Sequence, residues 1–193
     1  MVDKEIKPNV KNIILKEYCE KDGNQEYRYY LSRSLDNADK VVTVIMCNPS
    51  KASFIYEDKT VMNVNNYFTR EGYNKINIVN LFAYKNKEVS ELKKTNEEYE
   101  NKNIRYIEGA VEEASLIVVA WGYGKENLKN WKTKELKELS SNKINEVKHL
   151  LKDSNKLVQC FTNGKKKNLH PRDLNEETWK LTNYFEEDDN KKS

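Results

Sequence analysis

The chain has 193 residues, a length that predicts a single domain with its own hydrophobic core and leaves little room for a second catalytic domain. Its 34 Lys and Arg residues nearly balance its 31 Asp and Glu residues, so the net charge of +3 does not by itself indicate a polyanionic partner. No apolar run approaches the ~18 residues of a bilayer-spanning helix, and the polar N-terminus does not resemble a signal peptide. We therefore expect a cytoplasmic monomer that has no membrane contact.

The cysteine and histidine content argues against a metal site. Cys19, Cys47 and Cys160 are widely spaced and form no CxxC motif, so the sequence indicates neither a disulfide framework nor a zinc knuckle. The two histidines, His149 and His170, are too few for a conventional metal cage. We expect no metal and no cofactor.

An antiparallel hairpin is the first predicted element. Residues 13–15 begin an apolar arm, residues 22–24 have turn composition, and residues 27–32 alternate in character. The next stretch, 41–47, is continuously apolar, as expected for a strand covered on both faces. It ends at the turn sequence of residues 48–50.

The rest of the chain alternates between helical and strand patterns. Asp58 or Thr60 can cap a helix that Gly72 closes in a left-handed conformation. The further predicted strands are 76–82, 116–121 and 156–161, and the further predicted helices are 90–114, 136–151 and one near 174–185, before a polar tail at 186–193. This order predicts one domain over 1–193, a three-layer α/β/α sandwich with a four-stranded parallel core sheet and an N-terminal antiparallel hairpin.

Polar residues follow each of the four predicted parallel strands. In open α/β sheets, ligands bind beyond the carboxyl ends of such strands, where the connecting loops meet. The exit segments are Asn48 to Ser50, Asn80 to Phe82, Trp121 to Gly124, and the loop 163–173 that contains His170. The sequence therefore predicts a binding site at this edge of the sheet.

A series of motifs runs in order from about Tyr27 to Leu174: YRYYLSR, VIMCNPSKA, Asp58 with Thr60, GY…VNLFAYK, VVAWG and HP. Together these motifs resemble the family catalogued as domain of unknown function 1643. The order of four of these features is also similar to that of the uracil-DNA glycosylase superfamily. They are an Asn-Pro turn after the first core strand, an Asn at the end of a later strand, a Trp-Gly pair and a terminal His-Pro loop. This second resemblance implies the fold of that superfamily and cleavage of the N-glycosidic bond of an uncommon or modified base flipped into a pocket.

The resemblance implies a role for each motif. N-glycosidic hydrolysis needs a positioned water, stabilisation of an oxocarbenium-like sugar and donors for the departing base. Asn48 matches the position that holds the water, Asn80 the base-reading carboxamide, and His170 the donor to a base oxygen. Asp58 is an alternative, as a general base that activates the water.

Further residues complete the predicted site. The candidate substrate contacts, including aromatic rings able to stack on a base, are Pro49, Ser50, Phe54, Tyr56, Thr60, Phe82, Trp121 and Gly122. The candidate phosphate contacts are Arg28, Lys165, Lys166, Lys167 and Arg172, and residues 125–137 add five Lys against two Glu. Arg28 is equally suited to an ion pair across the hairpin.

Two other functions fit the same residues. Across all three functions, the expected partner is DNA, which can be single-stranded or modified, or a nucleotide. A non-catalytic module could bind nucleic acid or a nucleotide in the same pocket, and a small-molecule hydrolase could cleave a free nucleotide or nucleoside.

Overall fold

The computed structural model describes residues 12–50, 52–53, 55–86, 91–92, 95–122, 131–175 and 177–185. The elements within these ranges, in chain order, are β1 (Ile13–Asp22), β2 (Gln25–Leu35), β3 (Val41–Met46), α1 (Lys59–Arg70), β4 (Lys75–Asn80), α2 (Glu97–Glu113), β5 (Leu116–Val119), α4 (Lys134–Asp153), β6 (Val158–Thr162), the 3₁₀ turn η2 (Pro171–Asp173) and β7 (Lys180–Asn183). None of the helices in this part of the chain is both long enough and apolar enough to cross a membrane.

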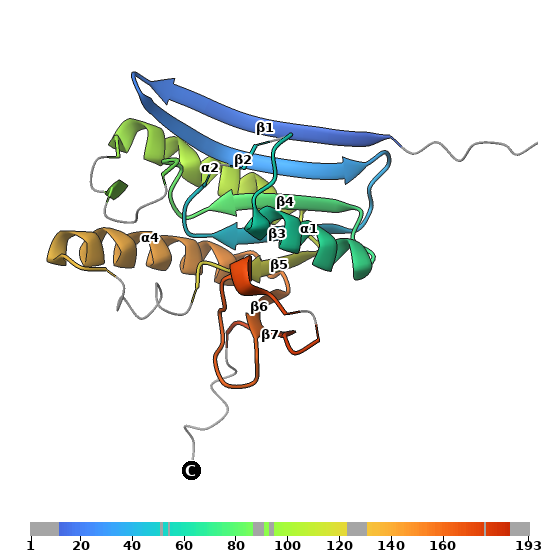
Figure 1. The fold of residues 1–193 in the computed structure, drawn as a ribbon. Coiled ribbons are helices and arrows are strands. Elements are labelled where there is room, and N and C mark those ends of the chain that lie inside the picture. Colours follow the sequence, from blue (N-terminus) through green and yellow to red (C-terminus); the bar gives the residue numbers. More distant parts are fainter. Residues whose placement is uncertain are drawn as a thin grey trace, which may run out of the picture.

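Seven strands form one sheet in the order β1-β2-β4-β3-β5-β6-β7. The central strands β4, β3, β5 and β6 pair parallel with one another, whereas β1 and β2 on one side and β7 on the other pair antiparallel with their neighbours. Figure 1 shows this sheet running from the β1–β2 hairpin to β7. The sheet is therefore a mixed, seven-stranded one, and the prediction of a four-stranded parallel core with an added hairpin is wrong in its strand count and in the nature of the sheet.

The seventh strand replaces the helix predicted near 174–185. Residues 171–173 form a single 3₁₀ turn, and β7 then pairs antiparallel with β6. Trp179 and Leu181 pack on one face of the sheet, while Tyr184 and Phe185 pack on the other. Trp179 and Leu181 are two residues apart and share one face, while Tyr184 lies on the other, as expected for an extended chain.

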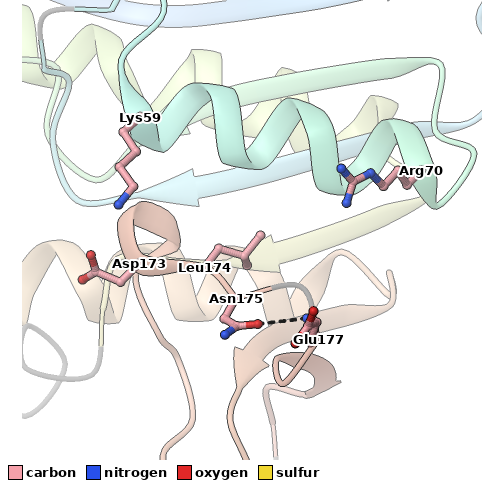
Figure 2. Close-up of a pocket in the computed structure, with 6 residues that line it drawn as sticks. All are labelled: Lys59, Arg70, Asp173, Leu174, Asn175 and Glu177. Atoms are coloured by element: carbon pink, nitrogen blue, oxygen red, sulfur yellow. Dashed lines mark hydrogen bonds between the residues drawn. The ribbon is translucent and has the colours of Figure 1, made fainter.

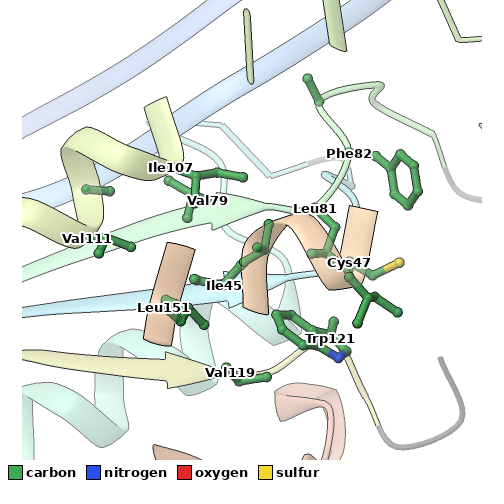
Figure 3. Close-up of a cluster of buried hydrophobic side chains, with 14 of the residues drawn as sticks. Ile45, Cys47, Val79, Leu81, Phe82, Ile107, Val111, Val119, Trp121 and Leu151 are labelled. Carbon is green, nitrogen blue, oxygen red and sulfur yellow. The ribbon is translucent and has the colours of Figure 1, made fainter. Parts of the chain in front are cut away.

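Helices cover both faces of the sheet because the buried strands alternate between two cores. In β3, Val42, Val44 and Met46 pack toward α1, whereas Ile45 packs toward α2 and α4. Figure 3 shows this second core, with Ile107 and Val111 of α2 and Leu151 of α4 over the strands. The molecule is thus layered as helix, sheet and helix.

The boundaries of α1 agree with its sequence signals. The Asp58 side chain accepts a hydrogen bond from the Val61 backbone N–H, so Asp58 is the N-cap. Val61, Val64 and Phe68 form its buried face, and Gly72 follows the helix with φ +79°. The start of α1 is consequently fixed close to the loop that leaves β3.

A bulge in the hairpin decides which way Arg28 points. Cys19 pairs with Arg28 and Tyr18 with Tyr30, so Tyr29 is the extra residue of β2. Beyond the bulge, Tyr30 and Ser32 donate hydrogen bonds to Asn77 in β4. Before it, Arg28 points to the α1 side, where it contacts the backbone of the loop after β3.

Candidate functional site

The order of the parallel strands creates a switch point at one edge of the sheet. β3 leads to α1 on one face, whereas its neighbour β5 is followed by α4 on the opposite face. Loops that diverge in this way border the kind of crevice in which open α/β sheets bind ligands, so a binding site is expected at the carboxyl ends of the two strands. The segments at this edge of the sheet are Asn48–Ser50 and Trp121–Gly122.

Asn48 is held by the loop that follows β4. Its Nδ2 donates to the Asn86 carbonyl oxygen at 2.9 Å, with longer contacts to the Asn86 side chain and the Pro49 carbonyl. The exits of β3 and β4 also lie side by side, because the Phe82 backbone N–H donates to the Cys47 carbonyl at 3.0 Å. The side-chain amide of Asn48 is thus anchored through its nitrogen, and within the described chain its Oδ1 accepts no hydrogen bond.

Asp58 is engaged through both carboxylate oxygens. Oδ1 caps α1 by accepting from Val61 at 3.0 Å, and Oδ2 accepts a hydrogen bond from the Ser50 hydroxyl. Ser50 comes from the Asn-Pro-Ser turn, so this bond ties the turn to the start of α1. The neighbouring Thr60 is buried in the first turn of the helix.

Asn80 ends β4 as a buried carboxamide without partners. The residue is 1% exposed, and neither Oδ1 nor Nδ2 has a hydrogen-bond partner in the part of the chain that the structure describes. It lies opposite Met46 in the parallel register, so its side chain points to the α1 side of the sheet. Buried polar side chains are nearly always hydrogen-bonded, which makes Asn80 an exception that calls for an explanation.

The backbone around Asn80 is held from the other face by two residues of α2. Asn103 donates to the carbonyl oxygens of Asn80 and Leu81 at 2.9 and 3.1 Å. The carboxylate of Glu100 accepts from the backbone N–H groups of Ala83 and Tyr84, at 2.9 and 3.0 Å, and from a threonine hydroxyl. Burial raises the pKa of the Glu100 carboxyl, although these donors act to lower it.

Sequence reasoning missed both of these positioning residues. They lie on the buried stripe of α2, where Glu100 is 4% and Asn103 0% exposed. A Glu and an Asn at helical spacing among apolar residues would have been the available signal, but the Lys/Glu-rich composition of this segment obscures it.

His170 lies beside the exit of β5. A Cβ placed on Gly122 would lie 3.5 Å from the Cβ of His170, and Gly122 has φ +99°, a conformation that side chains disfavour. The Gly122 backbone N–H also donates to the Asn168 side chain at 3.4 Å. The Trp-Gly and His-Pro motifs are therefore in contact, although they are far apart in the sequence.

The hydrogen bonds of His170 define the tautomer of its neutral form. Its Nδ1 accepts the Arg172 backbone N–H at 3.2 Å and so caps η2. A nitrogen that accepts a hydrogen bond carries no proton, so the proton of the neutral ring is on Nε2. The Asn63 side chain of α1 bonds to the carbonyls of Pro171 and Arg172, which ties the His-Pro loop to α1.

Arg28 contributes a buried positive charge beside the loop after β3. It is 1% exposed, and its guanidinium donates to the Ala52 carbonyl oxygen, while Nε has no hydrogen-bond partner among the described residues. Burial lowers the pKa of the guanidinium, and the acidic neighbours Glu17 and Asp58 counteract this shift. A group this buried and surrounded by carboxylates fits a role in holding the loop better than contact with a DNA phosphate.

The remaining predicted contacts differ in accessibility. Phe82 and Trp121 are fully buried and belong to the core, with Phe82 near Trp131 and Trp121 against Tyr184. Figure 3 shows Phe82 and Trp121 beyond the ends of the central strands. Pro49 is buried, Tyr56 is 60% exposed, and Phe54 lies outside the described residues.

The predicted phosphate contacts lie on the surface, with the exception of Arg28. The side chains of Lys165, Lys166, Lys167 and Arg172 are all exposed. The three lysines belong to a turn after β6, in which the Asn163 side chain accepts from the N–H groups of Lys165 and Lys166. Residues 125–130 of the other basic stretch lie outside the described part of the chain.

A surface groove adjoins this region along α1. It has a volume of about 710 Å³ and is lined by Lys59, Arg70, Asp173, Leu174, Asn175 and Glu177. Figure 2 shows Lys59 and Arg70 at opposite ends of α1, facing the segment that follows η2. Two cationic and two acidic residues line it, and none of the predicted base contacts does. Among the described residues, no group of three His, Cys, Asp or Glu side chains is placed to hold a metal ion.

Comparison with known proteins assigns the chain to a family. A family model described as protein of unknown function (DUF1643) matches residues 28–172. No curated protein and no solved structure matches the chain. Because the matched segment spans well over half of the sequence, and includes Asn48, Asn80 and His170, this chain belongs to the DUF1643 family.

Proposed function

We propose that this protein is a DNA glycosylase-like enzyme, which hydrolyses the N-glycosidic bond of an uncommon or modified base. The base would enter the crevice at the carboxyl ends of β3, β4 and β5 after flipping out of the nucleic acid. The similarity of its motifs to the uracil-DNA glycosylase superfamily, in fold and in activity, is part of this proposal.

The main support for the proposal is that the buried side-chain amide of Asn80 lacks hydrogen-bond partners among the described residues. A buried carboxamide with neither polar atom bonded is unfavourable unless something else compensates for it. One carboxamide presents a donor and an acceptor side by side, which is the complement of a nucleobase edge. Asn103 and Glu100 hold the backbone that carries this amide and the segment that follows it.

The contacts of Asn48 suit it to positioning the attacking water better than those of Asp58. The Nδ2 of Asn48 is fixed by Asn86, and its Oδ1 is left to accept a hydrogen bond from water. Asp58 already caps α1 and bonds to Ser50. We therefore assign Asn48 to the water and Asp58, with Ser50, to holding the turn that carries Asn48.

His170 is assigned to the departing base. Its tautomer places a proton on Nε2, which can donate to a base oxygen as negative charge develops there. In the reaction, the water oxygen bonds to the anomeric carbon, and the glycosidic electron pair leaves with the base nitrogen. The proton released by the water ends on the base or in solvent, so no further reactant is needed.

The test is mass spectrometry of the bases released from modified and unmodified genomic DNA. The proposal expects at least one base to be released, with a matching alkali-labile abasic site. Release should be lost in Asn48→Ala and in Asn80→Leu. It should be retained in Asn101→Ala, a substitution of an exposed asparagine on α2.

Other results would point elsewhere. Binding of DNA without release of any base would contradict the enzyme assignment and favour a non-catalytic binding module. Cleavage of free nucleosides or nucleotides, with no action on DNA, would favour a small-molecule hydrolase. Release that survives both Asn48→Ala and Asn80→Leu would refute the roles of these residues.

A further inference from the structure

The hairpin strand β1 forms an edge of the sheet that no described element covers. It is ten residues long and pairs only with β2 within the described chain. Four of its side chains are large, apolar and exposed: Ile13 at 68%, Ile14 at 40%, Leu15 at 37% and Tyr18 at 48%. A long exposed edge of this kind presents a row of backbone donors and acceptors to which another strand can pair.

The edge is regular, so a second strand can follow it along its whole length. The bulge of the hairpin lies in β2, and β1 itself keeps its alternation. On the α2 side, Tyr18 contacts Tyr106, and Glu20 forms an ion pair with Lys102 at 2.8 Å. A groove of about 370 Å³ lined by Lys102, Arg105 and Tyr106 lies on this side of the strand.

Symmetry restricts how two copies of this edge can meet. Antiparallel pairing of identical strands requires a two-fold axis perpendicular to the sheet, so opposing residues must face the same side. The two registers with the longest overlap centre on Glu17 and on Tyr18. The first places two Glu17 side chains directly opposite each other, which is unfavourable.

The second register is favourable in charge and in shape. It places Tyr18 opposite Tyr18, and Lys16 opposite Glu20 of the second copy, and symmetry repeats this ion pair on the other side of the axis. Glu20 would then lie between Lys16 of the second copy and its own Lys102. Opposite charges and aromatic pairs across strands each stabilise a sheet.

We propose that β1 pairs antiparallel with β1 of a second copy of this chain, with Tyr18 on the two-fold axis and Lys16 opposite Glu20. The two sheets then form one continuous sheet. The interface lies at the far edge from β5 and β6, so it leaves the crevice at β3 and β5 open and does not depend on the proposed function. It also replaces the monomer expected from the sequence.

The first test measures the dissociation constant of the dimer by sedimentation velocity on the full chain, from 1 to 300 µM. Lys16→Glu and Glu20→Lys should each weaken dimerisation about tenfold, because each converts two attractive pairs into repulsive ones. The double variant should return to within about threefold of the wild type. Lys21→Glu is the matched control, because Lys21 lies opposite Leu15 in this register.

A second test reads the register directly. In a Cys19→Ser background, Tyr18→Cys should form an intermolecular disulfide on mild oxidation, because this position lies opposite itself. Lys21→Cys in the same background should not. Circular dichroism of each variant shows whether it is folded. A monomer throughout the concentration range, a dimer unchanged by both charge reversals, or cross-linking at residue 21 and not 18 would overturn the proposal.

Discussion

The substitution Asn80→Leu should make the protein more stable while abolishing its function. Leucine has the same branching as asparagine and replaces the two polar atoms with methyl groups. Both polar atoms of Asn80 are buried without partners, and each such group costs about 1–3 kcal/mol. The methyl groups are larger than the polar atoms that they replace. Their crowding in the core costs about 1–3 kcal/mol and so offsets part of the stability gained by removing the unpaired polar atoms.

At the midpoints of these two ranges, the net change in the free energy of unfolding is a gain of about 2 kcal/mol. For a domain of this size it corresponds to a rise in Tm of roughly 2–4 °C per kcal/mol. The matched variant Asn80→Asp should instead be strongly destabilised at neutral pH, because a buried carboxylate without partners is far more costly than an amide.

Urea unfolding followed by circular dichroism measures both variants, with an unchanged slope m as the sign that the comparison is valid. Loss of more than about 1 kcal/mol in Asn80→Leu would refute the reasoning, since that is the expected effect of removing an amide with satisfied hydrogen bonds. Increased stability together with full activity would equally refute the role of Asn80 in binding.

Three further predictions concern Glu100, Asp58 and Cys19. Glu100→Gln should lower the free energy of unfolding by about 1–3 kcal/mol in urea titrations, because one amide oxygen cannot replace both carboxylate oxygens. Since the folded protein binds the Glu100 proton more tightly than the unfolded chain, the wild type should gain stability relative to this variant as pH falls through the raised pKa. Asp58→Ala should lose about 0.5–2 kcal/mol with the cap of α1, by the same measurement, whereas Asp58→Asn should lose less. Cys19 is exposed, yet desolvation of its thiol, followed by the charge of Glu17, raises its pKa to about 12, so its alkylation by iodoacetamide at pH 8 should be markedly slower than that of a free thiol, and Glu17→Gln should speed it.

Much of the fold was predictable because local signals and tertiary packing agree. The hairpin turn, the fully apolar run of β3 and the capped amphipathic pattern of α1 each specify their element without help from distant residues. The region after η2 was not predictable in this way. Its apolar residues suit a helix locally, but β6 offers an edge for pairing, and the gain from covering that edge decides the outcome.

The arrangement of the candidate site was likewise predictable only in part. The proximity of Gly122 to His170, and the adjacent exits of β3 and β4, follow from the parallel pairing of the central strands. Burial was not predictable, because it depends on the loops. Arg28 therefore has a position in the interior that its residue type alone does not indicate.

The central claim is that Asn48, Asn80 and His170 surround one nucleobase. The most direct measurement is ¹⁵N NMR of the side-chain amide and imidazole resonances during titration with a panel of free pyrimidine and purine bases. We predict that at least one base shifts the resonances of Asn48, Asn80 and His170 with a single dissociation constant, while Asn101 does not move. No response of Asn80 to any base, or separate saturation of Asn48 and Asn80, would contradict the claim.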